Sequence, residues 1–359
     1  MPTDWRGRGG CLWKRKGVLQ PGIHATEARK ARHLDVCLDE DVASTLDPGW
    51  SKVRLRHEAL PEIALDDVDC SVRFLGFRLR TPIVISSMTG GTSRAAELNL
   101  RLAEAAGAAG IVMGLGSGRA MIENPGLLPT FDVRAVAPSA VLFANIGAVS
   151  LNYGIGIEAV RRMVADLQAD GLFLHLNPLQ EALQPGGDTN FRGLLPKIAE
   201  LCAALEVPVV AKSVGSGIAP ATAARLLDAG VVGIDAAAAG GTSWARVEGK
   251  RSGDDRREAL AETFSGWGQP TAEAIRALRE RFPSTALIAS GGVRSGVDIA
   301  RAIALGADLC GLALPFLEAA TISREAVDEL IAALTDGLRI AMFATGSVRL
   351  SGLRRALLP

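Results

Sequence analysis

The stretch TALIASGGVRSGVDIARAIALGADLCGLA, residues 285–313, shows the pattern that decides the fold of this chain. Its apolar beginning ends at Gly291-Gly292, and an alanine- and leucine-rich segment follows over residues 297–305. A second apolar run then occupies residues 308–313. Short, continuous apolar runs are typical of strands that are buried on both faces, as in a parallel sheet. The stretch therefore predicts a strand, a helix and a second strand parallel to the first.

This unit of strand and helix recurs from residue 82 onward. Eight apolar runs alternate with helical segments at a nearly even spacing, which is broken by one longer gap between the sixth and seventh runs. Eight such units predict an α/β fold, a closed (β/α)8 TIM barrel, with a doubly wound open sheet as the alternative. The runs cover residues 82–87, 110–114, 140–146, 171–176, 207–213, 231–236, 285–290 and 308–313. Helices are expected over residues 95–109, 157–169, 194–205, 220–229, 271–281, 297–305 and 324–344.

The rest of the chain is assigned around this barrel, which we expect to form a single domain over residues 82–346. Residues 27–81 do not fit the repeat and are expected to cap one end of the barrel. Residues 1–26 are basic and glycine-rich without the apolar stretch of a signal peptide, so we expect a mobile N-terminal extension. Residues 347–359 are a C-terminal tail.

The composition excludes several classes of protein. Of the 359 residues 48% are hydrophobic, so the chain can bury a large core and is not disordered as a whole. Its 39 basic and 39 acidic residues give a formal net charge of +0, which argues against nucleic-acid binding. No apolar run approaches the roughly 18 residues that span a membrane, so no membrane association is expected. Five scattered cysteines are typical of reduced thiols in a cytoplasmic protein.

Glycine is present in excess, with 40 residues, or about 11% of the chain against a usual share of about 7%. Many of these glycines fall where an apolar run ends, and in a (β/α)8 barrel those ends carry the active site. The excess therefore indicates turns beside a ligand. In chain order the run ends carry Met88-Thr89-Gly90-Gly91, Gly116-Ser117-Gly118-Arg119, Asn145, His175 with Gln180 and Glu181, Lys212-Ser213, Gly240-Gly241-Thr242-Ser243-Trp244, Gly291-Gly292-Val293-Arg294 and Ala313-Leu314.

Gly291 and Gly292 are predicted to bind a phosphate. They follow the seventh run and precede a helix that begins near Ser295. Backbone N–H groups of a glycine turn and of a helix N-terminus together form an anion site. The end of the eighth run, Ala313-Leu314, can complete it. An ordinary tight turn is the alternative interpretation.

Two charged side chains at the run ends need partners. Lys212 ends an apolar run, so its ammonium is expected in the barrel mouth with a negative partner, such as a phosphate or an electron-rich ring. A surface lysine is the alternative. Glu181 beside Gln180 suits one Mg²⁺ that holds a diphosphate, although on spacing alone an acid complementing a helix N-terminus is the better interpretation.

Two further groups remain open to two interpretations. Arg29-Lys30, followed by Arg32 and His33, is either a phosphate clamp or a solvated helix face, and taken alone the solvated face is favoured. Trp244 either stacks on a planar ligand or fills a gap in the core.

Ten motifs follow one another along residues 27–346. They are ARKARH (28–33), SMTGG (87–91), GSGR (116–119), FANIG (143–147), HLNPLQE (175–181), FRGLL (191–195), VVAKSVGSGI (209–218), AGGTSWARVE (239–248), ASGGVRSGVDIARAIALGA (289–307) and LRIAMFATG (338–346). Together they resemble the family of type 2 isopentenyl-diphosphate isomerases. HLNPLQE is the most specific part, whereas residues 289–307 also resemble FMN-dependent oxidases and dehydrogenases.

The resemblance implies an enzyme that interconverts isopentenyl and dimethylallyl diphosphate with reduced FMN and Mg²⁺, and with NADPH or another reductant. It further implies a small-molecule diphosphate substrate and a homo-oligomer, a tetramer or an octamer. By the same resemblance, FMN would contact Met88, Thr89, Gly90, Ser117, Asn145, Lys212, Thr242, Gly291, Gly292, Val293, Ala313 and Leu314. The substrate would contact Arg29, Lys30, His33, Ser117, Gly118, Arg119, His175 and Gln180. The catalytic residues would be His175, Gln180 and Lys212, and Glu181 would bind Mg²⁺.

On this basis our hypothesis is that Lys212 favours anionic reduced flavin. One departure bears on it, because the family usually has Glu after this lysine and the chain has Ser213. A flavin-binding protein whose activity was lost at Ser213 is therefore one alternative. The other is an FMN-dependent 2-hydroxyacid oxidase or dehydrogenase on the same barrel, although the loop after the sixth run lacks the histidine or cysteine that such enzymes typically carry.

Overall fold

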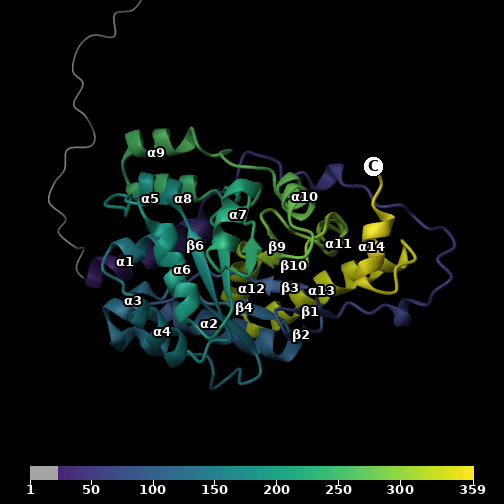
Figure 1. Cartoon of the computed structure of the whole chain (residues 1–359), viewed down its shortest axis with the longest axis horizontal. Helices are drawn as coiled ribbons and strands as arrows, with labels where there is room; N and C mark the ends of the chain where they lie inside the picture. The colour runs from purple at the N-terminus through teal and green to yellow at the C-terminus, as the bar shows by residue number, and fades with distance from the viewer. Residues whose placement is uncertain (1–22) are drawn as a thin grey trace, which may run out of the picture.

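The computed structural model describes residues 23–359, and within them eight parallel strands close into a barrel (Figure 1). The order around the barrel is β10-β3-β4-β5-β6-β7-β8-β9. Each strand overlaps one of the eight predicted runs, so the (β/α)8 barrel is confirmed and the open sheet is wrong. The strands are β3 (Ile83–Ile85), β4 (Val112–Gly114), β5 (Val141–Gly147), β6 (Gly171–Leu176), β7 (Val209–Ser213), β8 (Gly233–Asp235), β9 (Ala286–Ser290) and β10 (Leu309–Leu312).

The barrel is closed by β10, which pairs with the first and with the seventh strand of the barrel. Cys310 is aligned with Ile83 of β3, and Gly311 with Ser290 of β9. Because all eight strands are parallel, their carboxyl ends meet at one rim.

Helices surround the barrel, and the seven that the sequence predicts are present within a few residues of the expected bounds. The predicted helices are α2 (Ser93–Ala109), α4 (Ile157–Asp166), α6 (Leu194–Ala204), α7 (Pro220–Asp228), α10 (Thr271–Arg281), α11 (Gly296–Leu305) and α13 (Arg324–Phe343). The structure adds α1 (Ile23–Asp39), α3 (Arg119–Glu123), α5 (Pro178–Leu183), α8 (Trp244–Ser252), α9 (Asp255–Glu262), α12 (Leu314–Ile322), α14 (Leu350–Ala356) and the 3-10 turns η1 (Trp50–Lys52), η2 (Leu65–Asp67), η3 (Pro125–Thr130) and η4 (Ala148–Asn152).

Helix α2 illustrates how the sequence sets these elements. The Thr92 side chain caps its first turn by accepting a hydrogen bond from Ala95 N–H, and Gly110 ends it with φ 63°. Leu98 and Leu102 lie one turn apart, and both are buried against the barrel wall. The cap, the apolar stripe and the glycine stop together define the bounds of the helix.

One end of the barrel is filled by apolar side chains. The hairpin of β1 (Val72–Phe74) and β2 (Phe77–Leu79) packs there, and its Phe74 and Leu79 join a cluster with Phe143 and Phe173. The two latter rings lie 4.9 Å apart. This hairpin lies within the predicted capping segment, and the plug that it completes leaves the carboxyl rim as the open end.

Helix α1 packs against α8 and α3, beside the barrel rather than within its repeat (Figure 1). The N-terminal extension predicted for residues 1–26 lies outside the described residues, apart from its last four, which begin α1. None of the helices in the described part of the chain is long and apolar enough to cross a membrane.

Candidate functional site

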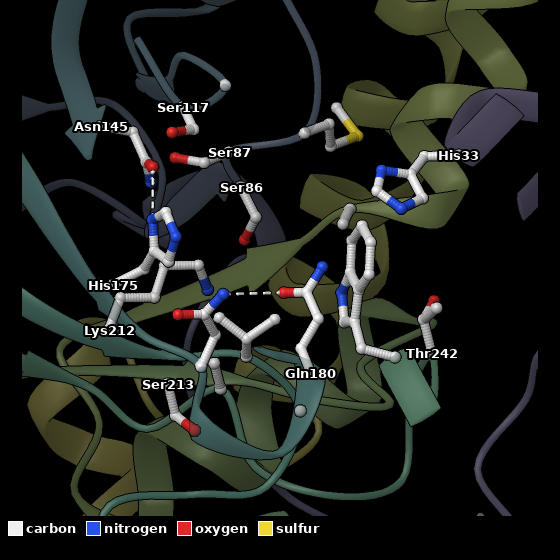
Figure 2. Close-up of a pocket in the computed structure, with 18 of the residues that line it drawn as sticks. His33, Ser86, Ser87, Ser117, Asn145, His175, Gln180, Lys212, Ser213 and Thr242 are labelled. Carbon is white, nitrogen blue, oxygen red and sulfur yellow. Dashed lines mark hydrogen bonds between the residues drawn. The ribbon is translucent and has the colours of Figure 1, made fainter. Parts of the chain in front are cut away.

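The carboxyl ends of the barrel strands surround a cavity of about 270 Å³, which is shown in Figure 2. Most of the predicted site residues line it, although they come from distant parts of the chain. Those that line it are Arg29, Lys30, His33, Met88, Thr89, Ser117, Arg119, Asn145, His175, Gln180, Glu181, Lys212, Thr242, Gly291, Gly292, Ala313 and Leu314. Trp244 lines it too, with its ring edge-on to that of His33 at 5.3 Å.

Three predicted residues, Gly90, Gly118 and Val293, are not part of the lining. A Cβ at Gly90 would lie 2.0 Å from the ring of Phe131, and one at Gly118 would lie 2.3 Å from the sulfur of Met163. Val293 is 1% exposed in the core. These residues shape the loops behind the cavity. Their positions give no support to the prediction that they contact a ligand.

Gly291 and Gly292 form a turn that no other residue type could replace without strain. Their φ angles are 119° and 70°, and a Cβ at Gly291 would lie 2.3 Å from the carbonyl oxygen of Ala238. Helix α11 begins at Gly296, directly after its cap Ser295. The predicted combination of glycine turn and helix N-terminus is therefore present at the cavity wall, where it can receive a phosphate.

His175 is held by its neighbour on the adjacent strand. Its Nδ1 lies 2.8 Å from Asn145 Oδ1, as Figure 2 shows, and this acceptor requires the hydrogen on Nδ1. Burial, with the charges of Lys212 and Lys30, lowers the pKa of His175 to about 4. The ring is therefore neutral at physiological pH and carries no proton on Nε2.

Lys212 already has a negative partner within the protein. Its Nζ lies 2.8 Å from Asp235 Oδ2, and the two residues are aligned in the register of β7 and β8. The sequence predicted a ligand, such as a phosphate or a ring, as the negative partner of Lys212. The partner in the structure is instead the carboxylate of Asp235 on β8. The adjacent Ser213 is 4% exposed.

A buried carboxylate, Glu248, connects two residues of the cavity wall, His33 and Gln180, with Arg251 behind it. Its Oε1 accepts hydrogen bonds from His33 Nε2 at 3.0 Å and from Gln180 Nε2 at 2.9 Å, and its Oε2 accepts from Arg251. The side chain is 0% exposed. Burial raises its pKa, but the hydrogen bond and charge of His33 and the charge of Arg251 outweigh burial and lower the pKa to about 2. Asn177 Nδ2 donates to Gln180 Oε1, so both ends of this amide are fixed.

Helix α1 brings cations to the cavity. Lys30 Nζ donates to the carbonyl of Ser117 at 2.9 Å and lies 4.9 Å from the ring centre of Phe131. Burial, with the charge of Arg29, lowers the pKa of Lys30 to about 7. Burial also lowers the pKa of Arg29, whose Nε has no hydrogen-bond partner. These under-compensated cations favour an anionic ligand over the solvated-face interpretation.

Glu181 lies in the first turn of α5, next to Gln180. Its oxygens accept from Asn177 Nδ2 at 2.8 Å and from the N–H of Asp188 at 2.7 Å, and burial raises its pKa. Asp188 in turn pairs with Arg119. Within residues 23–359 no three His, Cys, Asp or Glu side chains converge on a metal-sized space. A cation at Glu181 would therefore take most of its ligands from a bound substrate and from water.

Asp235 and Glu248 are the site residues that sequence reasoning missed. Asp235 is the last residue of β8 and lies within the run VVGIDA, where a carboxylate in an otherwise apolar strand already signals a buried partner. Glu248 ends the motif AGGTSWARVE, four residues after Trp244 and thus on the same helix face.

Two kinds of sequence match relate this chain to known proteins. The family model described as FMN-dependent dehydrogenase matches residues 188–359. The isopentenyl-diphosphate delta-isomerase of Nostoc sp. is 49% identical over 92% of this chain and 95% of its own length. The protein of the same name from Xanthobacter autotrophicus is 52% identical over 91% and 96%.

The solved structures that resemble this fold are more distant in sequence. A mandelate oxidase is 19% identical, covers 94% of this chain and 98% of its own, and has a TM-score of 0.63. A lactate oxidase of Pediococcus acidilactici is 15% identical with 96% coverage of both chains and the same TM-score. At this identity the likeness concerns the fold alone.

Proposed function

Because this chain belongs to the isopentenyl-diphosphate delta-isomerase family, we propose that it interconverts isopentenyl diphosphate and dimethylallyl diphosphate in the cavity at the barrel rim. It is an isomerase. The proposal concerns which of its residues bind the cofactor and the substrate and orient them for the reaction. The observation that supports it is that two groups suited to anions line one cavity. The turn at Gly291-Gly292 is one, and the cations Arg29 and Lys30 on α1 are the other.

The first anion site suits the phosphate of FMN. Gly291 lines the cavity, and its φ of 119° and the 2.3 Å that would separate a Cβ from the Ala238 carbonyl oxygen require glycine in this turn. In addition, the hydroxyls of Ser86 and Ser290 are buried, line the cavity and lack a hydrogen-bond partner. Unpaired buried hydroxyls fit the polar chain of a flavin. The residues that would hold FMN are those that the resemblance implies, among them Asn145, Lys212 and Thr242 of the cavity lining.

The second anion site suits the diphosphate of the substrate. Arg29 and Lys30 are the cations of this wall, and Arg119 lies beside them. Glu181 would hold Mg²⁺, which in turn would bind diphosphate oxygens. Lys30 would exchange its hydrogen bond to the Ser117 carbonyl for one to the anion.

The reaction moves a double bond and involves no net oxidation. Reduced FMN, when bound, supplies acid–base chemistry that ordinary side chains cannot offer to an unactivated alkene. His175 is neutral, so it does not donate a proton from Nε2 at physiological pH. Gln180 does not ionise, and its amide, fixed by Asn177 and Glu248, orients the reacting end of the substrate. The side chains therefore bind, orient and exclude water.

Several finer points belong to the same proposal. We expect the flavin to be reduced by NADPH or another reductant, activity to require Mg²⁺, and the enzyme to act as a homo-oligomer in the cytoplasm. The family typically forms tetramers or octamers, and size-exclusion chromatography with light scattering measures which of these this chain forms.

The hydroxyacid oxidase alternative has less support. Its solved representatives share only the fold with this chain, and the loop after β8 carries neither histidine nor cysteine between Ala239 and Lys250. Loss of activity rests on Ser213 alone, which departs from the family pattern, and relatives about 50% identical to this chain support an active isomerase over it.

The deciding experiment is an anaerobic assay with FMN, Mg²⁺ and dithionite, in which dimethylallyl diphosphate is detected from isopentenyl diphosphate. Product formation that depends on reduced FMN supports the proposal. Hydrogen peroxide formed from small 2-hydroxy acids would support the oxidase instead. FMN binding without any turnover in the wild-type protein would support lost activity, and Ser213→Glu would then be assayed for recovery.

A further inference from the structure

Lys212 and Asp235 form a buried ion pair at the mouth of the barrel. Their side chains are 11% and 1% exposed, and Lys212 Nζ lies 2.8 Å from Asp235 Oδ2. Lys212 lines the cavity, and in Figure 2 its side chain lies beside His175. Asp235 is not among the lining residues, so the carboxylate lies behind the ammonium as seen from the cavity.

The carboxylate is also fixed on its other side. Asp235 Oδ1 accepts a hydrogen bond from the N–H of Ala237 at 3.1 Å. Ala237 has φ 34°, in the left-handed region that residues other than glycine rarely adopt. A backbone held in this conformation while it donates to the carboxylate leaves Asp235 little freedom to move. The position of the ammonium is therefore set by β8 as well as by β7.

We propose that Lys212 and Asp235 act as one electrostatic unit, in which Asp235 limits how far Lys212 favours reduced over oxidised flavin. This inference rests on the proposed function, because it needs FMN in the cavity. Oxidised FMN takes up two electrons and one proton to become the anionic reduced form, which carries one more negative charge. A net positive charge at the cavity wall stabilises that form. The paired unit has a net charge of zero, so its preference is smaller than that of an unpaired lysine.

The consequence concerns how the enzyme reaches its working state. The proposed reaction consumes no electrons, so the flavin needs to be reduced once and then retained in that form. Asp235 is a positioning residue in this arrangement, because it acts on the flavin through Lys212. It sets how strong a reductant is required and where the ammonium lies.

The midpoint potential of the bound FMN tests the inference, measured by anaerobic dithionite titration with a reference dye. Asp235→Asn removes the negative charge and keeps the shape, so we expect a more positive potential. Lys212→Met is expected to make the potential more negative. The double variant restores a net charge of zero and should lie between the two single variants. A tenfold change in the relative affinity for reduced and oxidised FMN corresponds to about 30 mV for a two-electron couple, and we expect each single shift to reach that size.

The matched control is Glu262→Gln, which removes a carboxylate that pairs with Arg246 outside the cavity lining. Its potential should equal that of the wild type. An unchanged potential in Asp235→Asn, or a double variant with the potential of Lys212→Met, overturns the inference. If Asp235→Asn does not fold, the comparison of the double variant with Lys212→Met carries the test. Wild-type protein that binds no FMN would instead refute the proposed function, whereas bound FMN with unshifted potentials would leave it standing.

Discussion

Glu248→Gln is the substitution that most directly tests how the cavity wall is held together. The carboxylate accepts hydrogen bonds from His33, Gln180 and Arg251. A glutamine keeps the size of the side chain but offers one acceptor oxygen, and its NH₂ group points a donor at other donors. At least one of the three partners is then left without an acceptor in a buried place.

Two arguments give the same magnitude for the loss in the free energy of unfolding that Glu248→Gln causes. The pKa of Glu248 falls from 4.5 to about 2 in the folded protein, and a difference of that size corresponds to about 3 kcal/mol. Removing one partner of a buried ion pair costs about 3 to 5 kcal/mol. Because the folded pKa lies below the unfolded one, this contribution is complete above pH 4.5 and is lost as the pH falls toward 2. We therefore expect a loss of about 3 kcal/mol in the free energy of unfolding at pH 7.

The expected loss can be converted into measurable quantities. At an unfolding entropy of about 2.1 cal/mol/K per residue, it corresponds to a decrease of about 4 °C in Tm. The amide of Gln180 also loses the acceptor that fixes it, and a displacement of about 1 Å in a reacting arrangement can cost about 100-fold in rate. We expect kcat to fall roughly 10- to 100-fold, with a smaller change in KM, because Arg29 and Lys30 still bind the diphosphate.

Scanning calorimetry of the FMN-loaded protein and the anaerobic isomerase assay measure both effects. Glu262→Gln is the control, since Glu262 is 50% exposed and its pair with Arg246 should contribute less than about 1 kcal/mol. If Glu248→Gln matches this control in both Tm and kcat, the assignment of Glu248 as the residue that orients Gln180 is wrong.

Three further predictions use the same assays. Because the pKa of Lys30 lies near 7, its positive charge is lost as the pH rises through that value. The KM for isopentenyl diphosphate should therefore increase above pH 7 in the wild type. It should show no such dependence in Lys30→Met. A wild-type KM that is flat between pH 6 and 9 would contradict this assignment. Glu181→Gln should raise the Mg²⁺ concentration for half-maximal rate by about tenfold or more, titrated after EDTA treatment; an unchanged requirement would exclude Glu181 as the ligand. Gly291→Ala should distort the turn, because the new Cβ would lie 2.3 Å from the Ala238 carbonyl oxygen. We expect the purified variant to contain little FMN, as measured by flavin absorbance. A normal flavin content would show that this turn is not the phosphate site.

The barrel was predictable because its signal is local and repeated. Each strand is a short apolar run that is buried on both faces, and each run is followed by a helix with its own apolar stripe. Helix α9 was not predictable in this way, since Ala261 is its one buried residue and no stripe marks it. The long gap between the sixth and seventh runs contains this helix and α8.

The cavity lining was predictable for the same reason, because a residue that ends a barrel strand lies at the rim. What no local pattern reveals is which side chains meet there. Lys212 and Asp235 are 23 residues apart, and His33 and Glu248 are 215 apart. Such pairs depend on barrel closure and on the docking of α1. In each pair, a basic side chain that the sequence suggests for a ligand has a carboxylate of the protein as its partner.

The pairing of β10 with β3 also means that the barrel closes only late in the synthesis of the chain. Ile83 meets its partner Cys310 only after about 230 further residues have been added. At about 5 to 20 residues per second this takes roughly 10 to 45 s, during which β3 presents an unpaired apolar edge. Exposed strand edges recruit other chains. The yield of soluble protein should therefore depend on chaperone supply during translation more than on the stability of the finished barrel.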